Sequence, residues 1–521
     1  MNTVSQKIFK NTLFNAFGNI FTTFLQILII PYILLKLGSE RFGIWALVSM
    51  IFGIFTALDL GTGTAFVKYF SEYHTKKEHE NFNRVMVAGF LFMLTFSLVL
   101  IFIVILIKDQ LVSFFNIPED LKSESIFVFV LAAVIFGTNN TFGVFQAILK
   151  GLQRMEITNS INMICSTIYV VGIFGVLYYG FGLRGLIVNQ GIKIFLISLA
   201  AIYYSKKINR NLKFKFSYLD FKPIKEILSY GIKMQISSIA NLVNLQTDKT
   251  IIGYFLNLTS ITAYEIGQKI SFFCRMIVGL VLSALVPAVS ELEAAGKKQS
   301  ILKLYERGNK YIASFTFPIL IFTIVFANYL INLWMGIGFE KSIYVARLLV
   351  CAVLVNMLTG VGVMIVRGIG KPFYETQYAI ICLILNVVLG LILIRFYGFL
   401  GVVVATPISV IIGSVYFIIK FHRLNEVPLF GFIRRIYFKP FLISIFLAAV
   451  LYIANILINY RSGFDTRLEI LLLIILNGII FFSLFILLLK KSGYWDEEDK
   501  ILLVTTTNHY PILGRLIANS I

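Results

Sequence analysis

Long apolar runs separated by short polar connections dominate the pattern along the chain. A run of about 20 apolar residues is long enough to cross the hydrocarbon core of a bilayer as a helix, and fourteen such runs occur. We expect transmembrane helices over 10–35, 42–68, 85–107, 125–149, 157–179, 183–205, 226–252, 260–288, 309–332, 342–366, 373–395, 399–419, 438–459 and 467–489. The predicted fold class is therefore all-α, a polytopic membrane protein.

Composition agrees with this pattern. Of the 521 residues, 58% are hydrophobic and 14% are charged, which is more apolar surface than a soluble core can bury. The longest outer connection, 108–124, is short, so we expect no sizeable extramembrane domain. The first apolar run lacks a small-residue cleavage pattern, and we expect it to remain in the mature protein.

The basic residues indicate an orientation. If both termini lie inside, the inner segments hold 31 of the 46 Lys and Arg residues and the outer loops hold 9. Lys and Arg concentrate in cytoplasmic loops, so we expect both termini in the cytoplasm. The net charge of +20 is spread over many short loops beside the spans. This spread favours anionic membrane lipids, and not nucleic acid, as partners.

Three short motifs recur in the second half of the chain at offsets of 217 to 219. The pairs are Tyr179-Gly180-Phe181 with Tyr397-Gly398-Phe399, Lys150-Gly151 with Arg367-Gly368, and Ser71-Glu72 with Ser290-Glu291. They predict two pseudo-symmetric six-helix lobes that insert in the same direction as parallel repeats. The predicted parts are an N-lobe (1–210), a basic cytoplasmic linker (211–225), a C-lobe (226–425), two further helices (426–495) and a cytoplasmic tail (496–521).

The first helix of each predicted lobe carries a polar stripe. Spacings of 4, 4, 3 and 4 residues place both stripes on one helical face, and we expect the two faces to border a central cavity. The alternative is that these groups only hydrogen-bond between packed helices, at about 0.6 kcal/mol each. The stripes are Lys233, Ser237, Asn241, Asn244 and Asp248 in one helix, and Asn11, Asn15, Asn19, Thr22 and Gln26 in the other.

Nine charged side chains fall inside predicted spans, where charge is costly and usually functional. Six bases against three acids leave a net charge of +3, which favours an anionic ligand such as a phosphate. Pairing of Glu265 with Lys269, and snorkelling of Lys233, Lys249 and Arg347, are the structural alternatives. The nine are Asp59, Lys193, Lys233, Asp248, Lys249, Glu265, Lys269, Arg275 and Arg347.

The signs of catalysis are missing from the sequence. Its four cysteines lie in spans without metal or redox spacing, its four histidines lie in loops or the tail, and no phosphate-binding G-x-x-x-x-G-K-[ST] loop occurs. We therefore expect a transporter and not an enzyme, with no catalytic residue, no metal site and no ATP hydrolysis by this chain.

The fourteen spans, the twin lobes, the stretch 11–38, the run Asp59-Leu60-Gly61 and the pair Asp248-Lys249 before Ile252-Gly253 resemble a known family. It is the polysaccharide transporter, or O-antigen (lipid-linked oligosaccharide) flippase, family of the multidrug/oligosaccharidyl-lipid/polysaccharide (MOP) exporter superfamily. The resemblance covers nearly the whole chain. It implies flipping of an undecaprenyl-diphosphate-linked oligosaccharide across a bacterial inner membrane by alternating access, for surface polysaccharide biosynthesis.

The resemblance also suggests roles for the charged and polar residues. We expect the substrate's diphosphate or sugar at Lys193, Lys233, Asn241, Asn244, Lys249, Lys269, Arg275 and Arg347. Candidate sites for a coupling ion, Na⁺ or H⁺, are Asp59, Asp248 and Glu265. No other cofactor is implied, and other polysaccharide-assembly membrane proteins are candidate partners.

Three other functions stay open. One is flipping of a lipid-linked peptidoglycan precursor. Another is multidrug and toxin extrusion, which predicts an acidic cavity in the first half, whereas 10–35 contains no acid. The last is a polysaccharide polymerase, an enzyme that would need the outer loop 108–124.

Overall fold

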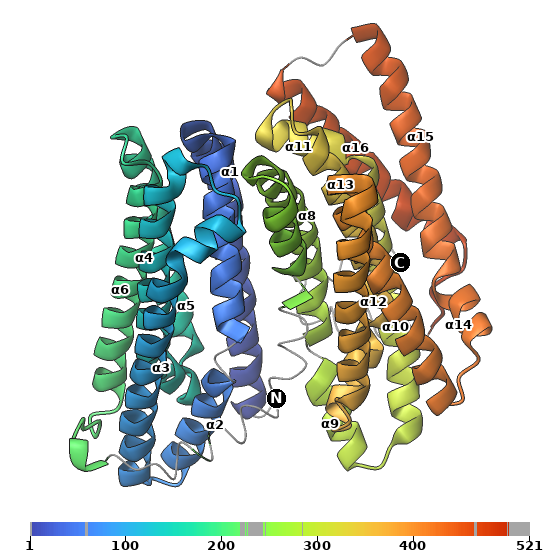
Figure 1. Cartoon of the computed structure of the whole chain (residues 1–521). Coiled ribbons are helices and arrows are strands. Elements are labelled where there is room, and N and C mark those ends of the chain that lie inside the picture. Colours follow the sequence, from blue (N-terminus) through green and yellow to red (C-terminus); the bar gives the residue numbers. More distant parts are fainter. Residues whose placement is uncertain are drawn as a thin grey trace. The chain divides into compact units, whose positions relative to one another are not determined.

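A computed structural model describes residues 3–57, 61–218, 225, 227, 243–244, 246–283, 285–462, 466–497 and 499. Within these residues the chain is almost wholly helical and contains no strand, which confirms the predicted all-α class (Figure 1). The first elements are α1 (Thr3–Ala57), α2 (Thr62–Thr75), α3 (His79–Phe114), α4 (Glu119–Gly151), α5 (Met155–Tyr178), α6 (Gly182–Ile208) and the 3₁₀ turn η1 (Phe216–Tyr218).

The second half is built in the same way. A helical segment at 246–255 comes before the named elements. They are α8 (Leu258–Ser283), α9 (Leu285–Ala294), α10 (Lys298–Val325), α11 (Ala327–Met335), α12 (Glu340–Gly368), α13 (Phe373–Leu424), α14 (Leu429–Ile436), α15 (Phe438–Ser462) and α16 (Arg467–Lys491).

In the described part of the chain, ten helices are long and apolar enough to cross a membrane. Two of them, α1 with 55 residues and α13 with 52, are more than twice the length that a bilayer requires. Each bends at a non-helical glycine, Gly38 or Gly398, between two predicted spans. The total of fourteen spans stays a prediction, because most of 226–252 lies outside the described residues.

Several predicted boundaries were wrong. The span 42–68 is broken, because α1 ends at Ala57 and α2 begins after Gly61, whose φ of 70° is left-handed backbone. A break at Phe326 likewise separates α10 from α11 within the predicted span 309–332. The expected outer connection 108–124 is mostly helix, because α3 continues to Phe114 and α4 starts at Glu119. Hydropathy indicates which residues lie within the membrane, but it does not indicate where the backbone stops being helical.

The internal repeat is visible in the way equivalent helices end. After α2 the Lys77 amide donates to the His74 carbonyl, and after α9 the Gly296 amide donates to the Glu293 carbonyl. Lys77 and Gly296 both hold left-handed backbone, with φ of 58° and 68°. The two turns lie 219 positions apart and have the same hydrogen-bond pattern.

The packing of the helices repeats as well. A Cβ on Gly151, at the end of α4, would lie 2.9 Å from Phe70 Cβ on α2. A Cβ on Gly368, at the end of α12, would lie 2.6 Å from Val289 Cγ1 on α9. Small residues allow such close helix crossings in membrane proteins. The same crossing therefore occurs once in each half, as the recurring motifs predict.

The chain forms two compact units, Met1–Glu265 with Leu383–Val402, and Ile266–Cys382 with Val403–Ile521. In the first unit, buried side chains of α2, α3 and α4 form a core around Phe70 and Phe82. In the second, α10, α12 and α15 surround Phe317 and Phe326. The lobe boundaries at 210 and 226 stay a prediction.

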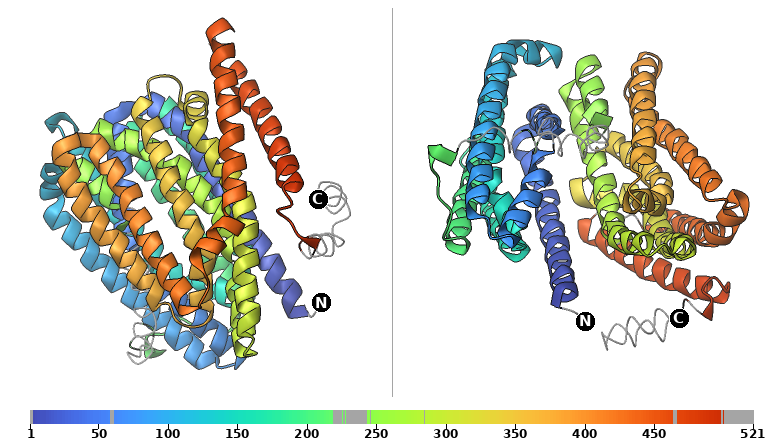
Figure 2. Two further views of the ribbon diagram at one scale, coloured as in Figure 1. Left: turned by 90° about the vertical axis from the view of Figure 1, so that its right-hand side faces the viewer. Right: turned by 90° about the horizontal axis from the view of Figure 1, so that it is seen from below.

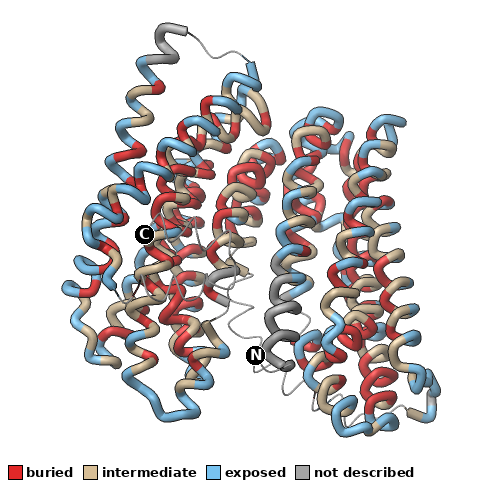
Figure 3. Tube along the Cα trace, turned by 180° about the vertical axis from the view of Figure 1, so that it is seen from behind, coloured by how far each residue is buried: buried red, intermediate tan, exposed pale blue. Residues whose placement is uncertain are grey.

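Many large apolar residues are exposed and do not belong to these cores, and the exposed positions are pale blue in Figure 3. On α3, Leu98, Phe102 and Leu106 are each about 60% exposed. Such a surface suits contact with lipid. The last two long helices, α15 and α16, pack on each other, and α15 also packs on α10 (Figure 2).

Candidate functional site

A buried polar cluster lies within the first unit, where 246–255, the start of α8 and part of α13 meet. The Asp248 carboxylate is 1% exposed and accepts a hydrogen bond from the Tyr264 hydroxyl. Asn386 on α13 donates to Asp248 Oδ1 and to Asn244 Oδ1, at 3.1 Å each. Carboxylate, amide and hydroxyl oxygens thus converge on one place inside an apolar helix bundle.

An ion pair joins the two residues that directly follow Asp248 and Tyr264 in the sequence, namely Lys249 in the segment 246–255 and Glu265 on α8. Lys249 Nζ donates to Glu265 Oε2 at 2.8 Å, and both side chains are 5% exposed. The burial of Lys249 excludes the snorkelling alternative for this residue, and its partner in the pair is Glu265. With Asp248 included, the cluster contains two carboxylates and one ammonium group.

A tight turn sets the register of this cluster. Asn257 accepts at its Oδ1 from the Ser260 amide at 2.9 Å and so caps the start of α8. The start of α8 is anchored to α1 just after the bend of α1 at Gly38. There, Thr262 Oγ1 donates to the Ser39 carbonyl at 2.6 Å. A Cβ on Gly43 would lie 2.4 Å from the Leu258 carbonyl oxygen, so only glycine fits this crossing.

Lys193 lies elsewhere in the first unit, on α6. It is half-buried, and its Nζ lies 5.1 Å from the centre of the Tyr169 ring on α5, a cation–π contact. Asn189 donates to the Tyr169 carbonyl at 2.9 Å and helps to hold α5 against α6. The contact with the Tyr169 ring therefore fixes the position of the Lys193 ammonium group. Among the described residues, no carboxylate pairs with it.

Three predicted site residues belong to the second unit. Lys269 and Arg275 on α8 and Arg347 on α12 are all half-buried. Arg347 Nε donates to the Ile324 carbonyl at 3.2 Å, near the end of α10. The remaining predicted site residues, Asp59, Lys233 and Asn241, lie outside the described residues.

The structure thus brings together Asn244, Asp248, Lys249 and Glu265 from the predicted set. Two members of the cluster were missed, Tyr264 and Asn386, because neutral residues were not singled out in those spans. A signal for Asn386 was present, since a single amide within the apolar stretch 378–394 needs a hydrogen-bonding partner. Among the described residues, no group of three or more His, Cys, Asp or Glu side chains could hold a metal ion.

Comparison with known proteins gives a consistent picture. The model of the family described as "Polysaccharide biosynthesis protein" matches residues 8–293. A "Putative O-antigen transporter" of Shigella flexneri is 21% identical, over 78% of this chain and 96% of that protein. A "Probable low-salt glycan biosynthesis flippase Agl15" of Haloferax volcanii is 25% identical, over 76% of this chain and 80% of that protein.

Solved structures share the fold. A lipid II flippase MurJ in an inward closed conformation superposes with a TM-score of 0.72 and 16% identity, covering 92% of this chain and 98% of that one. An inward-facing multidrug resistance MATE transporter of the MOP superfamily gives a TM-score of 0.63 and 15% identity, over 81% and 96%. Since the family model covers more than half of the sequence, this multi-pass membrane protein belongs to the polysaccharide biosynthesis protein family.

Proposed function

We propose that this chain is a flippase that moves oligosaccharide repeat units, linked to a polyprenyl diphosphate, from the cytoplasmic to the outer leaflet. The observation that carries the proposal is membership of a polysaccharide biosynthesis family whose relatives include an O-antigen transporter and a glycan biosynthesis flippase. The fold shared with a lipid II flippase supports it.

The cationic side chains within the spans would bind the diphosphate. Lys193 is half-buried without a carboxylate partner among the described residues, so its charge is available to an anion. Arg275, Lys269 and Arg347 would contribute in the second unit, and Lys233 and Asn241 stay in the proposed site from their positions in the sequence. Lys249 would act only after its pair with Glu265 opens.

The Asp248 cluster would bind the coupling ion. Asp248, Tyr264, Asn244 and Asn386 provide the hard oxygen atoms that Na⁺ prefers, and a buried carboxylate can alternatively take up H⁺. Glu265, neutralised by Lys249, is the weaker candidate, and Asp59 stays a prediction. Binding of the ion would favour one of two alternating states of the transporter.

The lipid chain of the substrate also has a place to lie. In the first unit, α1, α3 and Thr250 line an apolar cavity of about 420 Å³, whose walls include Phe55, Phe96 and Phe114. Thr250, on the cavity wall, directly follows Lys249 of the buried polar cluster in the sequence. A polyprenyl chain could lie there while its headgroup is held by polar groups.

The setting of this activity would be a bacterial inner membrane with both termini in the cytoplasm. Other polysaccharide-assembly membrane proteins would supply and consume the lipid-linked substrate. Flipping of a peptidoglycan precursor would use the same chemistry with another sugar. Extrusion of organic cations is the second candidate, favoured by the two carboxylates against one ammonium in the described buried cluster.

Gene deletion tests the proposal. We expect loss of surface polysaccharide and accumulation of lipid-linked oligosaccharide on the cytoplasmic leaflet, where an impermeant sugar-cleaving reagent cannot reach it. Restoration by the wild-type gene completes the test. Normal surface polysaccharide in the deletion strain would contradict the proposal.

A further inference from the structure

A polar cavity in the first unit, separate from the Asp248 cluster, lies between α2 and α4. Its volume is about 510 Å³, and α3 contributes Met93 to its wall. It extends from the start of α2 at Gly61 and Thr62 to Lys150 near the end of α4. Since a helix rises about 1.5 Å per residue, the α4 wall from Asn139 to Lys150 is roughly 16 Å long.

The internal repeat explains why the cavity exists. In the second unit, a Cβ on Gly360 of α12 would lie 2.6 Å from Leu282 Cδ1 of α8, so the Leu282 side chain fills the space between α8 and α12. The positions equivalent to Gly360 and Leu282 in the first half are Gly143 and Gly63, at the same offsets of 217 and 219. A Cβ on either of these glycines would meet nothing within 4 Å. The missing leucine side chain leaves the space open.

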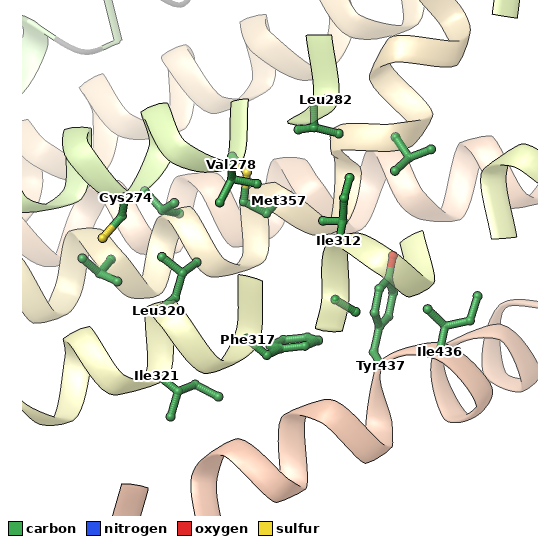
Figure 4. Packing of buried hydrophobic residues seen from close by; sticks show 14 of the residues in the cluster. Cys274, Val278, Leu282, Ile312, Phe317, Leu320, Ile321, Met357, Ile436 and Tyr437 are labelled. Atoms are coloured by element: carbon green, nitrogen blue, oxygen red, sulfur yellow. The ribbon is translucent and has the colours of Figure 1, made fainter. Parts of the chain in front are cut away.

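Two other lining residues also differ between the two halves, because they are polar in the first half and apolar in the second. Asn140 and Gln146 line the cavity, whereas their equivalents Met357 and Val363 belong to the buried apolar core of the second unit. Figure 4 shows Leu282 and Met357 within that core. The first half therefore has polar groups and open space where the second half has packed hydrocarbon.

The charge at the mouth also differs. Arg367 in the second half is neutralised by Glu375, with Arg367 Nε donating to Glu375 Oε2 at 2.6 Å. The equivalent residues in the first half are Lys150 and Thr158, so the cation is kept and the carboxylate is replaced by a hydroxyl. Lys150 forms no ion pair with any residue that the structure describes.

The lining of the cavity includes hydrogen-bond donors. The side-chain amide nitrogen of Asn140 is buried and has no hydrogen-bond partner. Gly61 provides no side-chain cap for the first N–H groups of α2, and the first residues of this helix, Thr62 to Thr64, line the cavity. Together with the Lys150 ammonium, they match the oxygen atoms of a phosphate, which accept hydrogen bonds and carry negative charge.

We propose that this cavity is a binding site for the diphosphate-bearing headgroup of a prenyl lipid, present in the first half of the repeat only. The inference rests on the proposed function and adds to it a second, cytoplasm-proximal binding site. Lys150 neutralises the diphosphate from one end of the cavity, Asn140 donates to it from the other end, and Gln146 and Asn139 face the attached sugar. The headgroup enters here before it reaches the charges deeper in the spans.

Binding to the purified full-length chain tests the site. The probe is farnesyl diphosphate, with farnesol and inorganic pyrophosphate as comparisons. Gly63→Leu introduces the leucine side chain that fills the equivalent space in the second half, where Leu282 stands. Lys150→Gln removes the positive charge. Each change should weaken farnesyl diphosphate binding about tenfold or more. Gly143→Leu fills the cavity from the opposite wall and should have the same effect.

Matched controls separate this effect from misfolding. Gly175→Leu on α5 places the same side chain at another helical glycine with nothing within 4 Å, and Lys206→Gln removes an exposed lysine at the end of α6. Both should bind the probe as the wild type does. Equal binding by the cavity variants and the controls would overturn the proposal. So would inorganic pyrophosphate binding as tightly as farnesyl diphosphate, since the ligand would then be a free anion.

Export in cells distinguishes failure of the site from failure of the function. If the cavity variants export normally in a strain where gene deletion blocks export, the site is wrong and the flippase function stands. If the deletion strain exports normally, the flippase function is wrong, and the binding measurement alone decides the site.

Discussion

Lys249 and Glu265 form an ion pair of 2.8 Å in which both side chains are 5% exposed. Removing one partner of such a buried pair leaves an uncompensated charge, at about 3–5 kcal/mol. We therefore expect Lys249→Met and Glu265→Gln each to lower the thermal unfolding temperature of the purified protein strongly. The double variant should be much closer to wild type. Additive losses in the double variant would show that the two groups are not coupled.

The oxygen cluster around Asp248 predicts a specific dependence on an ion gradient. Asp248→Asn keeps the shape of the side chain and removes its charge, so transport should lose its response to an imposed Na⁺ or H⁺ gradient. Tyr264→Phe removes one hydrogen-bond donor and leaves the carboxylate, so it should keep that response at reduced ion affinity. The measurement is uptake of lipid-linked substrate by vesicles with and without each gradient. An unchanged gradient response of Asp248→Asn would exclude Asp248 as the coupling site.

The repeated helix crossing predicts equal behaviour at two glycines. A Cβ would lie 2.9 Å from Phe70 at Gly151, and 2.6 Å from Val289 at Gly368. We expect Gly151→Ala and Gly368→Ala each to destabilise the protein by about 1–3 kcal/mol through overpacking. Gly175→Ala, where a Cβ meets nothing within 4 Å, should be neutral or slightly stabilising because alanine favours helix. Unfolding in denaturant measures all three, and indistinguishable midpoints would refute the repeated close contact.

The segment after α16 predicts a response to acid. Lys310 Nζ on α10 lies 3.0 Å from Asp496 Oδ2, and Lys310 also forms an ion pair with Asp499. Burial acts to raise the pKa of Asp496, but the Lys310 hydrogen bond, the hydrogen bond from the Asp499 amide and the Lys310 charge together outweigh it and hold that pKa below its ordinary value of 3.8. A carboxyl whose folded pKa is lowered contributes stability above its unfolded pKa and loses it as the pH falls through the folded value.

The segment should therefore stay docked near neutral pH and be released below about pH 4. Fluorescence of Trp495 reports this release when Trp45 and Trp334 are replaced by Phe. Lys310→Met should release the segment at neutral pH already. Emission that is the same in both proteins from pH 7 to pH 3 would contradict the docking by Lys310.

Much of this fold follows from the sequence because a bilayer imposes a simple requirement. Each apolar run must satisfy its own backbone hydrogen bonds, so it must be helical. The repeat was also predicted from three short motifs, and the glycine of one of them, Gly398, marks the bend of α13. What hydropathy could not predict is the break between Ala57 and Thr62 or the helical continuation of α3 to Phe114.

The candidate site was predictable in part. Asp248, Lys249 and Glu265 stand out as charges in apolar runs, but their partners depend on the register between 246–255 and α8. That register is set by the turn at Asn257, which has no distinctive sequence pattern. Whether Asn241 and Lys233 join the cluster stays a prediction.

The most direct test of the central claim is flipping by the purified protein in liposomes. A fluorescently labelled, polyprenyl-diphosphate-linked oligosaccharide is placed in both leaflets, and an impermeant quencher added outside reports access to the inner pool. We predict that the wild-type protein lets the quencher reach nearly all of the label with time. Lys193→Gln together with Arg275→Gln should leave the inner pool protected, as protein-free liposomes do. Continued protection of the inner pool in liposomes that contain folded wild-type protein would contradict the account.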